Sequence, residues 1–230
     1  MAAPADITIQ DLNGIWVMDK SNSTDPDAIL QLQGISWIVR KAIQFATVTL
    51  HVTQYTETDP ETSKPIVKID INQVTTGGLS GTTEKRVLTW TEHEHRDHIF
   101  GTVVGKSRFF RGAKGADGKV RPNIDVQTDV KDEKVHRFLR GEILADGTEV
   151  EGFLVEEPKD VDDLGLGEGE GLWLQSFVRN VDSGWTAEQI WGFEIINGER
   201  RYTRRIAVAD KNGKYQLGRM VYTFQGRKEQ

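Results

Sequence analysis

Three of the five histidines in this chain of 230 residues lie within six positions, in the segment TEHEHRDHIFG at 91–101. His93 and His95 are two residues apart, so they would share one face of a strand, as the ligands of some β-barrel zinc sites do. His98 would point to the opposite face unless a turn intervenes. The charged residues around them favour a solvent-exposed rim, because burying them together is costly. We therefore expect no metal here, although a rim histidine could still act as an acid or a base toward a ligand.

No other set of residues in the sequence matches a catalytic or cofactor-binding motif. The chain has no cysteine, which excludes disulfides, thiol catalysis and cysteine-ligated zinc. It lacks the G-x-S-x-G nucleophile motif, the phosphate-binding G-x-x-x-x-G-K-[ST] motif, a dinucleotide-binding glycine pattern and the D-x-D-x-D-G calcium loop. The 35 acidic residues place carboxylates side by side by chance and single out no catalytic pair. We expect no cofactor and leave the catalytic residues unassigned.

The net charge and the start of the chain limit the partners and the compartment. The formal net charge is −6, which argues against a nucleic-acid partner. The segment MAAPADITIQ lacks the basic and apolar regions of a secretory signal peptide. No apolar run reaches the roughly 18 residues that span a membrane. We therefore expect a cytoplasmic protein without an integral membrane segment, in which the residues before Asp11 are frayed.

Apolar and polar residues alternate with a period of two through most of the chain, and this alternation predicts strands. In the segment PIVKIDINQVTT, for example, isoleucines and valines alternate with charged and polar residues. We predict about eleven strands, and three of them lie at 84–95, 134–144 and 148–157. Two glycine-rich segments are predicted to be long loops, the basic 112–123 and the acidic 156–172.

The clearest hairpin is centred on the Asn-Gly dipeptide at 197–198, because a type I′ turn needs positive φ at both positions. Counting outwards from this turn places Phe193 opposite Tyr202 and Trp191 opposite Arg204. These four side chains would share one largely apolar face, on which an arginine needs a partner. The guanidinium could stack on the indole, or it could hold a carboxylate or phenolate of a ligand.

Three further features bear on the candidate site. They are an ion pair on the other face of the same hairpin, a histidine on a strand and a tryptophan on a helix. Glu194 falls opposite Arg201, which predicts an exposed ion pair. His51 alternates with Leu50 and Val52 on a strand, so it lies either on the surface or among the polar groups of a cavity. Trp37 falls on a helix that could contact a ligand.

One region is predicted to be helical, the segment 25–46. Acidic residues and Pro26 stand in its first turn, and Gly34 ends that first helix. The segment ISWIVRKAIQFA then places its apolar residues at helical spacing. A helix-turn-helix therefore follows the first strand.

The stretch LNGIWVMDKSNSTDPDAILQLQGISWIVRKAIQFATVTLHV resembles the opening of the intracellular fatty-acid-binding proteins, within the calycin superfamily. The family's G-x-W motif is matched at 14–16, its turn between helices at 34–35 and its Arg-Lys pair at 40–41. This resemblance implies an antiparallel, up-and-down, calycin-like β-barrel of about ten strands, with a helix-turn-helix after the first strand. It also implies a hydrophobic ligand inside the barrel.

Near its C-terminus that family uses Arg-x-Tyr to hold a ligand carboxylate. In this chain Arg219 and Tyr222 are one residue further apart, which puts them on opposite faces of a regular strand. As a whole, the chain also resembles a group of fungal calycin-like proteins. Some relatives in that group are cofactor-independent pericyclases, including hetero-Diels–Alderases, which implies an alternative function as an enzyme of secondary metabolism.

We therefore expect one calycin-like domain over 1–230, with a helical lid at 25–46, that binds a small hydrophobic molecule in its barrel. The alternatives are a pericyclase that uses the same cavity as its active site, and a scaffold protein whose barrel is filled by its own side chains. Eight residues are predicted to contact the ligand: Trp37, His51, Trp191, Phe193, Tyr202, Arg204, Arg219 and Tyr222.

Overall fold

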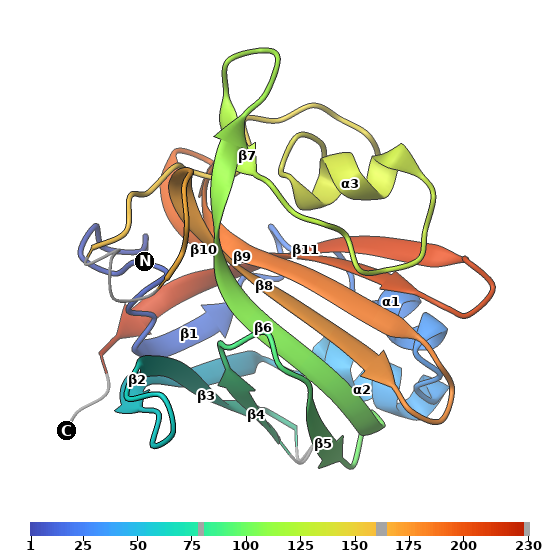
Figure 1. The fold of residues 1–230 in the computed structure, drawn as a ribbon. Coiled ribbons are helices and arrows are strands. Elements are labelled where there is room, and N and C mark those ends of the chain that lie inside the picture. The colour runs from blue at the N-terminus through green and yellow to red at the C-terminus, as the bar shows by residue number, and fades with distance from the viewer. Residues whose placement is uncertain (78–80, 160–164, 228–230) are drawn as a thin grey trace.

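The structure is a computed structural model, and it describes residues 1–77, 81–159 and 165–227. The described residues form eleven strands and three helices (Figure 1). The strands are β1 (Gly14–Met18), β2 (Val48–Thr58), β3 (Pro65–Thr75), β4 (Thr82–Val87), β5 (His93–Asp97), β6 (Gly101–Lys114), β7 (Val120–Pro122), β8 (Glu170–Asn180), β9 (Thr186–Ile196), β10 (Glu199–Ala209) and β11 (Tyr215–Gly226). The helices are α1 (Asp27–Leu32), α2 (Trp37–Phe45) and α3 (Glu133–Leu139).

The strands form one antiparallel sheet that curls into a half-barrel. Ten of them follow one another in the order β4-β3-β2-β1-β11-β10-β9-β8-β6-β5, and β7 pairs with β6 alone. The predicted antiparallel fold of about ten strands is therefore confirmed. The two ends of this order, β4 and β5, share no ladder among the described residues, although β4 lies beside β6. The curl is closed at that edge by side-chain contacts and by a backbone hydrogen bond of 2.9 Å, from the N–H of Trp90, just after β4, to the carbonyl oxygen of Ser107 on β6.

The predicted helix-turn-helix after the first strand is confirmed as α1 and α2. Ser36 caps α2 by accepting a hydrogen bond from the backbone N–H of Val39. An ion pair of 3.1 Å between Arg40 and Asp27 joins the two helices. Helix α1 packs against β11, so the pair covers one end of the half-barrel (Figure 1).

The N-terminal residues lie at the opposite end of the half-barrel from α1 and α2 (Figure 1). Ile7 and Ile9 are buried there in the inner core, with exposed fractions of 1% and 2%. The buried amide of Gln54 bonds to the backbone of Ile9 and Leu12. The expectation that residues before Asp11 are frayed is therefore wrong, because this segment fills the end of the curl that the helices leave open.

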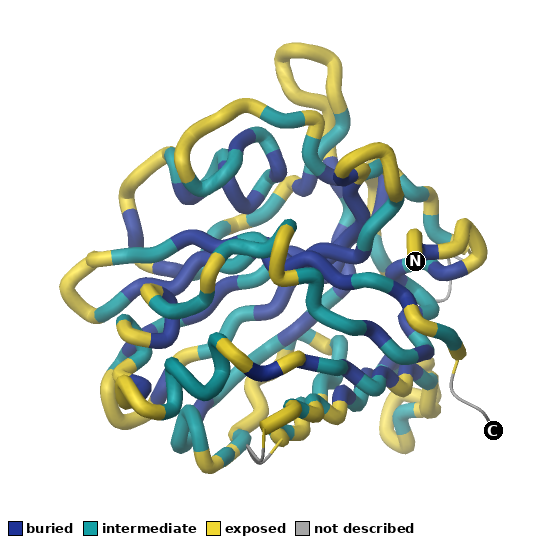
Figure 2. The backbone as a smooth tube through the Cα atoms, turned by 180° about the vertical axis from the view of Figure 1, so that it is seen from behind, coloured by how far each residue is buried: buried dark blue, intermediate teal, exposed yellow. Residues whose placement is uncertain are grey.

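Both faces of the sheet are covered, and each face has its own apolar core. On β10 the inward side chains of Tyr202 and Val208 belong to the core inside the curl. The outward side chains of Ala207 and Ala209 belong to a second core, which includes α3. Figure 2 shows the resulting pattern, in which buried stretches run along the strands and the turns are exposed.

We call the segment that covers the outer face of the sheet, including α3, the outer layer. This layer was not predicted from the sequence, because a strand was assigned to the segment that forms its helix. The segment 134–144, predicted as a strand, begins with helix α3 instead. The carboxylate of Asp132 accepts the backbone N–H of Lys134 at 2.9 Å and so caps that helix. Its buried face consists of Val135, Phe138 and Leu139. Their spacing is helical, and the period-two interpretation overlooked it.

Four other predicted segments also differ from the structure, in whole or in part. The single strand predicted at 84–95 is two strands, β4 and β5, separated by a bend at Trp90, whose φ is 59°. The segment predicted as a strand at 148–157 forms no strand among the described residues, and one isolated bridge, Phe153 with Glu194, joins it to the sheet. The loop predicted at 112–123 contains the hairpin of β6 and β7. In the predicted acidic loop at 156–172, residues 160–164 lie outside the described residues, and β8 begins at Glu170.

A buried carboxylate fastens the outer layer to β9. The backbone N–H of Gln127 and that of Thr128 donate to the same carboxylate oxygen of Glu188, at 2.9 and 3.0 Å. The side-chain amide of Gln175 donates to the other oxygen at 2.7 Å. Burial raises the pKa of Glu188 above its ordinary value, in spite of these hydrogen bonds.

Replacing Glu188 with glutamine is therefore expected to change how stability depends on pH. Since the pKa of Glu188 is raised on folding, its ionisation opposes the folded state as the pH rises above about 4.5, the ordinary value. The free energy of unfolding of Glu188→Gln, relative to the unmodified protein, should rise between pH 4 and pH 7. Urea unfolding at several pH values measures this difference. A difference that is constant or falls over the same range would contradict the proposed pKa direction.

Candidate functional site

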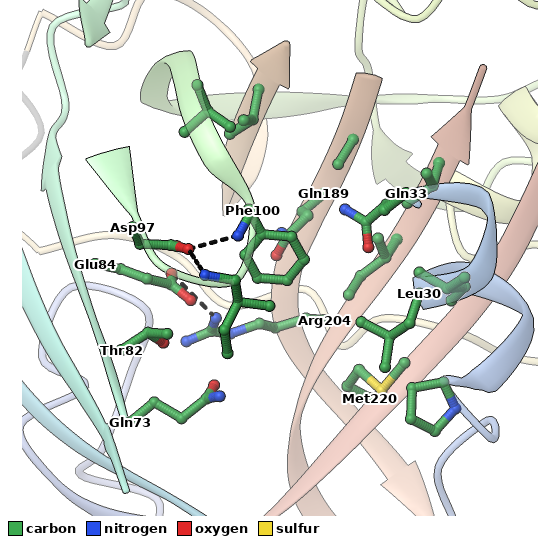
Figure 3. A pocket seen from close by; sticks show the side chains of 18 of the residues that line it. Leu30, Gln33, Gln73, Thr82, Glu84, Asp97, Phe100, Gln189, Arg204 and Met220 are labelled. Carbon is green, nitrogen blue, oxygen red and sulfur yellow. Dashed lines mark hydrogen bonds and ion pairs between the residues drawn. The ribbon is translucent and has the colours of Figure 1, made fainter. Parts of the chain in front are cut away.

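The inside of the curl holds a cavity of about 630 Å³, lined by the helix pair, by strands β4 to β6 and β9 to β11, and by single residues of β1, β2, β3 and β8. Much of its wall is apolar, and this part includes Leu30, Phe100, Val178, Ala187, Val208 and Met220. Figure 3 shows Leu30 of α1 and Met220 of β11 on one side, facing Glu84 and Asp97 of the two edge strands on the other. A cavity of this size accommodates a small organic molecule. This cavity argues against the alternative of a barrel filled by its own side chains.

Arg204 brings a positive charge to the cavity wall. Its side chain is only 4% exposed, and its guanidinium lies 3.9 Å from the centre of the Trp191 ring. Of the two alternatives for Arg204, the stacking on Trp191 is observed, in the register that the Asn-Gly turn predicts; ligand contact stays a prediction. Its Nε donates to the hydroxyl of Tyr202 at 2.9 Å, and its Nη1 lies 3.7 Å from the carboxylate of Glu84. The buried Nη2 has no hydrogen-bond partner, so the guanidinium retains donor capacity that the described residues do not use.

A second arginine completes the polar part of the wall. Arg86 of β4 donates from Nε and Nη2 to one oxygen of Glu84, at 3.2 and 2.7 Å. Its Nη1 reaches across the curl to the hydroxyl of Ser176 on β8, and its guanidinium lies 5.0 Å from the Trp191 ring. The indole therefore has two guanidinium neighbours, Arg86 and Arg204. These contacts also bind the edge strand β4 to the far side of the sheet.

The charges of Glu84, Arg86 and Arg204 do not cancel. Burial raises the pKa of Glu84, but Arg86 and Arg204 together hold it below its ordinary value, so the group is a carboxylate at neutral pH. Burial lowers the pKa of Arg204, but Tyr202, Tyr222 and Glu84 raise it above the ordinary arginine value. Two arginines thus face one carboxylate. The wall keeps a net positive charge, which favours a ligand with an electron-rich oxygen.

Two tyrosines lie next to Arg204 and remain neutral. Burial raises the pKa of both Tyr202 and Tyr222 above the ordinary tyrosine value. Their rings are 5.4 Å apart, and Tyr222 lines the cavity whereas Tyr202 does not. A neutral phenol keeps its proton, so Tyr222 can donate a hydrogen bond to a ligand in the cavity.

The histidine cluster lies on the edge strand β5 and at its end. His93 and His95 line the cavity, whereas His98 does not. His93 and His98 are exposed, as expected for a rim, and His95 is half-buried. Among the described residues no group of three or more histidine, aspartate or glutamate side chains is arranged to hold a metal ion. The Nε2 atom of His95 is buried and has no hydrogen-bond partner.

The structure brings two of the eight predicted ligand-contacting residues to the cavity wall, Arg204 and Tyr222. Trp191 lies behind Arg204, and Phe193 and Tyr202 pack around Trp16 in the inner core. His51 and Trp37 are outside the cavity wall, and the Trp37 side chain is 63% exposed on α2.

Arg219 is also outside the wall, because its Nη1 bonds to Glu194 on the outer face at 3.1 Å. The spacing of Arg219 and Tyr222 predicts that they lie on opposite faces of β11. The structure confirms this, because Arg219 bonds to Glu194 on the outer face and Tyr222 lines the cavity. Ligand contact by any of the eight residues remains a prediction.

Sequence reasoning missed the residues that the edge strand β4 contributes. Glu84 and Arg86 stand two residues apart, so one face of a strand carries both charges. This alternation was visible in the sequence, but nothing in it showed that the face points into the curl. Leu30, Gln189 and Met220 were missed for the same reason, since helix α1, β9 and β11 meet only in the folded chain.

No family model matches the chain. By sequence it is similar to two curated fungal proteins. The probable pericyclase scpY of Mollisia scopiformis is 24% identical over 231 residues, which cover 98% of this chain and 95% of that protein. The pericyclase pydY of Acremonium sp is 25% identical over 226 residues, which cover 98% of both proteins.

Solved structures similar to this one include two fatty-acid-binding proteins. Fatty-acid-binding protein 1 of Echinococcus granulosus has a TM-score of 0.45 and 11% identity, and the match covers 92% of this chain and 96% of that one. The Schistosoma mansoni fatty acid binding protein in complex with arachidonic acid has a TM-score of 0.44 and 12% identity, over 93% and 95% of the two chains. The chain is therefore similar over nearly its whole length to two fungal proteins, one named as a probable pericyclase and one as a pericyclase.

Proposed function

We propose that the chain binds a small, mainly hydrophobic molecule in the cavity and orients it through an oxygen atom near Arg204. The observation that supports this proposal is an apolar cavity of about 630 Å³ with a buried, incompletely paired guanidinium in its wall. The apolar wall would supply most of the affinity, at about 25 cal/mol for each Å² of apolar surface removed from water. An unpaired buried donor costs about 1–3 kcal/mol, and a ligand oxygen that accepts from it recovers part of that cost.

Filling the cavity is expected to weaken this binding strongly. Ala187 lines the cavity from β9, and a phenylalanine there would occupy space that a ligand needs. We expect Ala187→Phe to weaken the binding of the fluorescent hydrophobic anion 1-anilinonaphthalene-8-sulfonate at least tenfold, measured by fluorescence titration. The matched control is Ala113→Phe at an exposed position of β6, which should bind the probe as the unmodified protein does. Equal affinities for the probe in all three proteins would show that binding occurs outside the cavity.

A second candidate function is catalysis of a pericyclic reaction in the same cavity. Two relatives named as pericyclases, similar over nearly the full length of this chain, favour it. Such a reaction needs a flexible substrate folded into a reactive geometry, which an apolar cavity can impose. It is also accelerated by a donor that withdraws electron density from a carbonyl next to the reacting alkene, and Arg204 and Tyr222 are positioned as such donors.

This second function is tested with a linear trienone, in which a terminal diene and an enone are joined by three methylene groups. The protein should increase the rate of intramolecular cycloaddition and change the ratio of the fused bicyclic products, as measured by chromatography. Ala187→Phe should return both the rate and the ratio to those of the reaction without protein. A rate and a ratio that the unmodified protein leaves unchanged, although the trienone displaces the fluorescent probe, would favour a binding protein over an enzyme.

A further inference from the structure

His95 is a titratable side chain in the cavity wall that neither proposed function uses. A pericyclic reaction rearranges electron pairs without transferring a proton, and hydrophobic binding needs no imidazole. The buried Nε2 atom of His95 nevertheless has no hydrogen-bond partner. An unpaired buried nitrogen is costly, and such groups in native structures call for an explanation, of which a catalytic role is one.

The surroundings of His95 bring a base and an oxygen-binding cation to the same place. The carboxylate of Glu84 interacts electrostatically with both Arg204 and His95, and it lies 3.7 Å from Nη1 of Arg204. All three line the cavity. His95 is half-buried on the edge strand β5, so rotation about its side-chain torsions can turn the unpaired nitrogen toward a bound molecule.

We propose that His95 is a proton-transfer residue that isomerises unsaturated ketones bound in this cavity, with the ketone oxygen held at Arg204. This inference rests on the proposed binding function. A neutral imidazole nitrogen together with a donor for the developing oxyanion is the arrangement needed to remove a proton next to a carbonyl. The expected ligands are hydrophobic ketones whose carbon–carbon double bond is not yet conjugated with the carbonyl.

The proposed step is balanced without a cofactor. The nitrogen of His95 takes a proton from the carbon between the carbonyl and the double bond, and the electron pair of that C–H bond forms a new C=C bond to the carbonyl carbon. The carbonyl π electrons move to the oxygen, which accepts a hydrogen bond from Arg204. The imidazolium then returns the proton to the far carbon of the original double bond, and the carbonyl re-forms. The product is the conjugated ketone, and no atom or electron is gained or lost.

This activity would prepare the substrate of the second candidate function. Conjugation with a carbonyl makes an alkene electron-poor, and the intermediate of the transfer is itself a conjugated diene. Both are partners in a cycloaddition. The chemistry of proton transfer and the chemistry of ring formation would therefore share one cavity and one oxygen-binding arginine.

The test uses 4-dodecen-2-one, a linear ketone whose double bond is not conjugated. Displacement of the fluorescent probe first measures whether the ketone enters the cavity. Isomerisation is then followed by the ultraviolet absorbance of the conjugated ketone, and in heavy water by deuterium at the carbon that receives the proton. We expect the unmodified protein to accelerate isomerisation and His95→Gln to be at least tenfold slower while it binds the ketone equally well.

The matched control is His98→Gln, the same substitution at an exposed position outside the cavity wall, which should isomerise the ketone at the unmodified rate. Equal binding by His95→Gln shows that this variant is folded. The inference is overturned if the ketone binds but is not isomerised, or if His95→Gln is as fast as the unmodified protein. A ketone that fails to displace the probe from the unmodified protein would overturn the proposed function as well.

Discussion

Replacing Arg204 with methionine is expected to slow cycloaddition of the linear trienone about a hundredfold, with a much smaller effect on the binding of apolar probes. Removing one donor from a preorganised site that stabilises developing negative charge typically lowers the rate by about two orders of magnitude or more. Under the second proposed function Arg204 would be such a donor, because it is buried, positively charged and held in place by Tyr202, Glu84 and the Trp191 ring. Single-turnover rates and probe affinities for both proteins measure the two effects separately.

The substitution also changes the charge of the site, so it needs two companions. The variant Glu84→Gln/Arg204→Met removes the carboxylate together with the cation, and it should be as slow as Arg204→Met if the missing donor is the cause. Arg179→Met, at an exposed position of β8, is the matched control and should react at the unmodified rate. If Arg204→Met is folded and retains more than half of the unmodified rate, Arg204 does not polarise the substrate.

Replacing Glu194 with alanine is expected to lower the free energy of unfolding by about 3–5 kcal/mol. The substitution leaves Arg205, whose exposed fraction is 0%, without its carboxylate partner, and breaking a buried ion pair from one side costs about that much. Both Nε and Nη2 of Arg205 donate to Glu194 at 2.9 Å. Its Nη1 donates to the carbonyl oxygens of Phe138 and Ile143, so the same arginine holds the α3 segment against the sheet.

Urea unfolding at neutral pH measures this loss, and Glu199→Ala is the control. Glu199 pairs with Arg201 at the exposed end of the same hairpin, so its removal should cost less than about 1 kcal/mol. Burial raises the pKa of Glu194, but Arg205 and Arg219 hold it below the ordinary value, so its stabilising effect is present above about pH 4.5 and is lost as the pH falls through the lowered pKa. A loss below about 1 kcal/mol at neutral pH would mean that solvent reaches Arg205 in the variant.

The hairpin of β9 and β10 illustrates how far local reasoning reaches. The Asn-Gly turn fixes the register, and the observed partners of Trp191 and Phe193 are the predicted ones, Arg204 and Tyr202. Register follows from the turn because its two residues leave the strands a single way to pair. The exposed ion pair predicted between Glu194 and Arg201 is wrong. Glu194 lies under the outer layer and pairs with Arg205 and Arg219 instead.

That error has a definite physical cause. Alternation along a strand separates two faces but does not say which of them is covered, and here both are. The covering segment is 123–155, whose helix α3 was predicted to be a strand because valines, leucines and a phenylalanine occur in both kinds of element. Because α3 was predicted to be a strand, its cover over β9 and β10 was not expected. Glu194, about 60 positions further along the chain, was therefore given an exposed environment instead of a buried one.

By itself, the sequence determined the antiparallel strands, the helix pair after the first strand and the pairing of Trp191 with Arg204. These features depend on turns, caps and periodicities that act over a few residues. Only the tertiary structure decided that the sheet stops at a half-barrel, and that Glu84 and Arg86 of β4 meet Arg204 of β10 across its interior. It also decided that His95 lines the same cavity as Glu84 and Arg204. These contacts join strands that share no backbone hydrogen bonds, so they depend on how tightly the sheet curls, and no local pattern records that curvature.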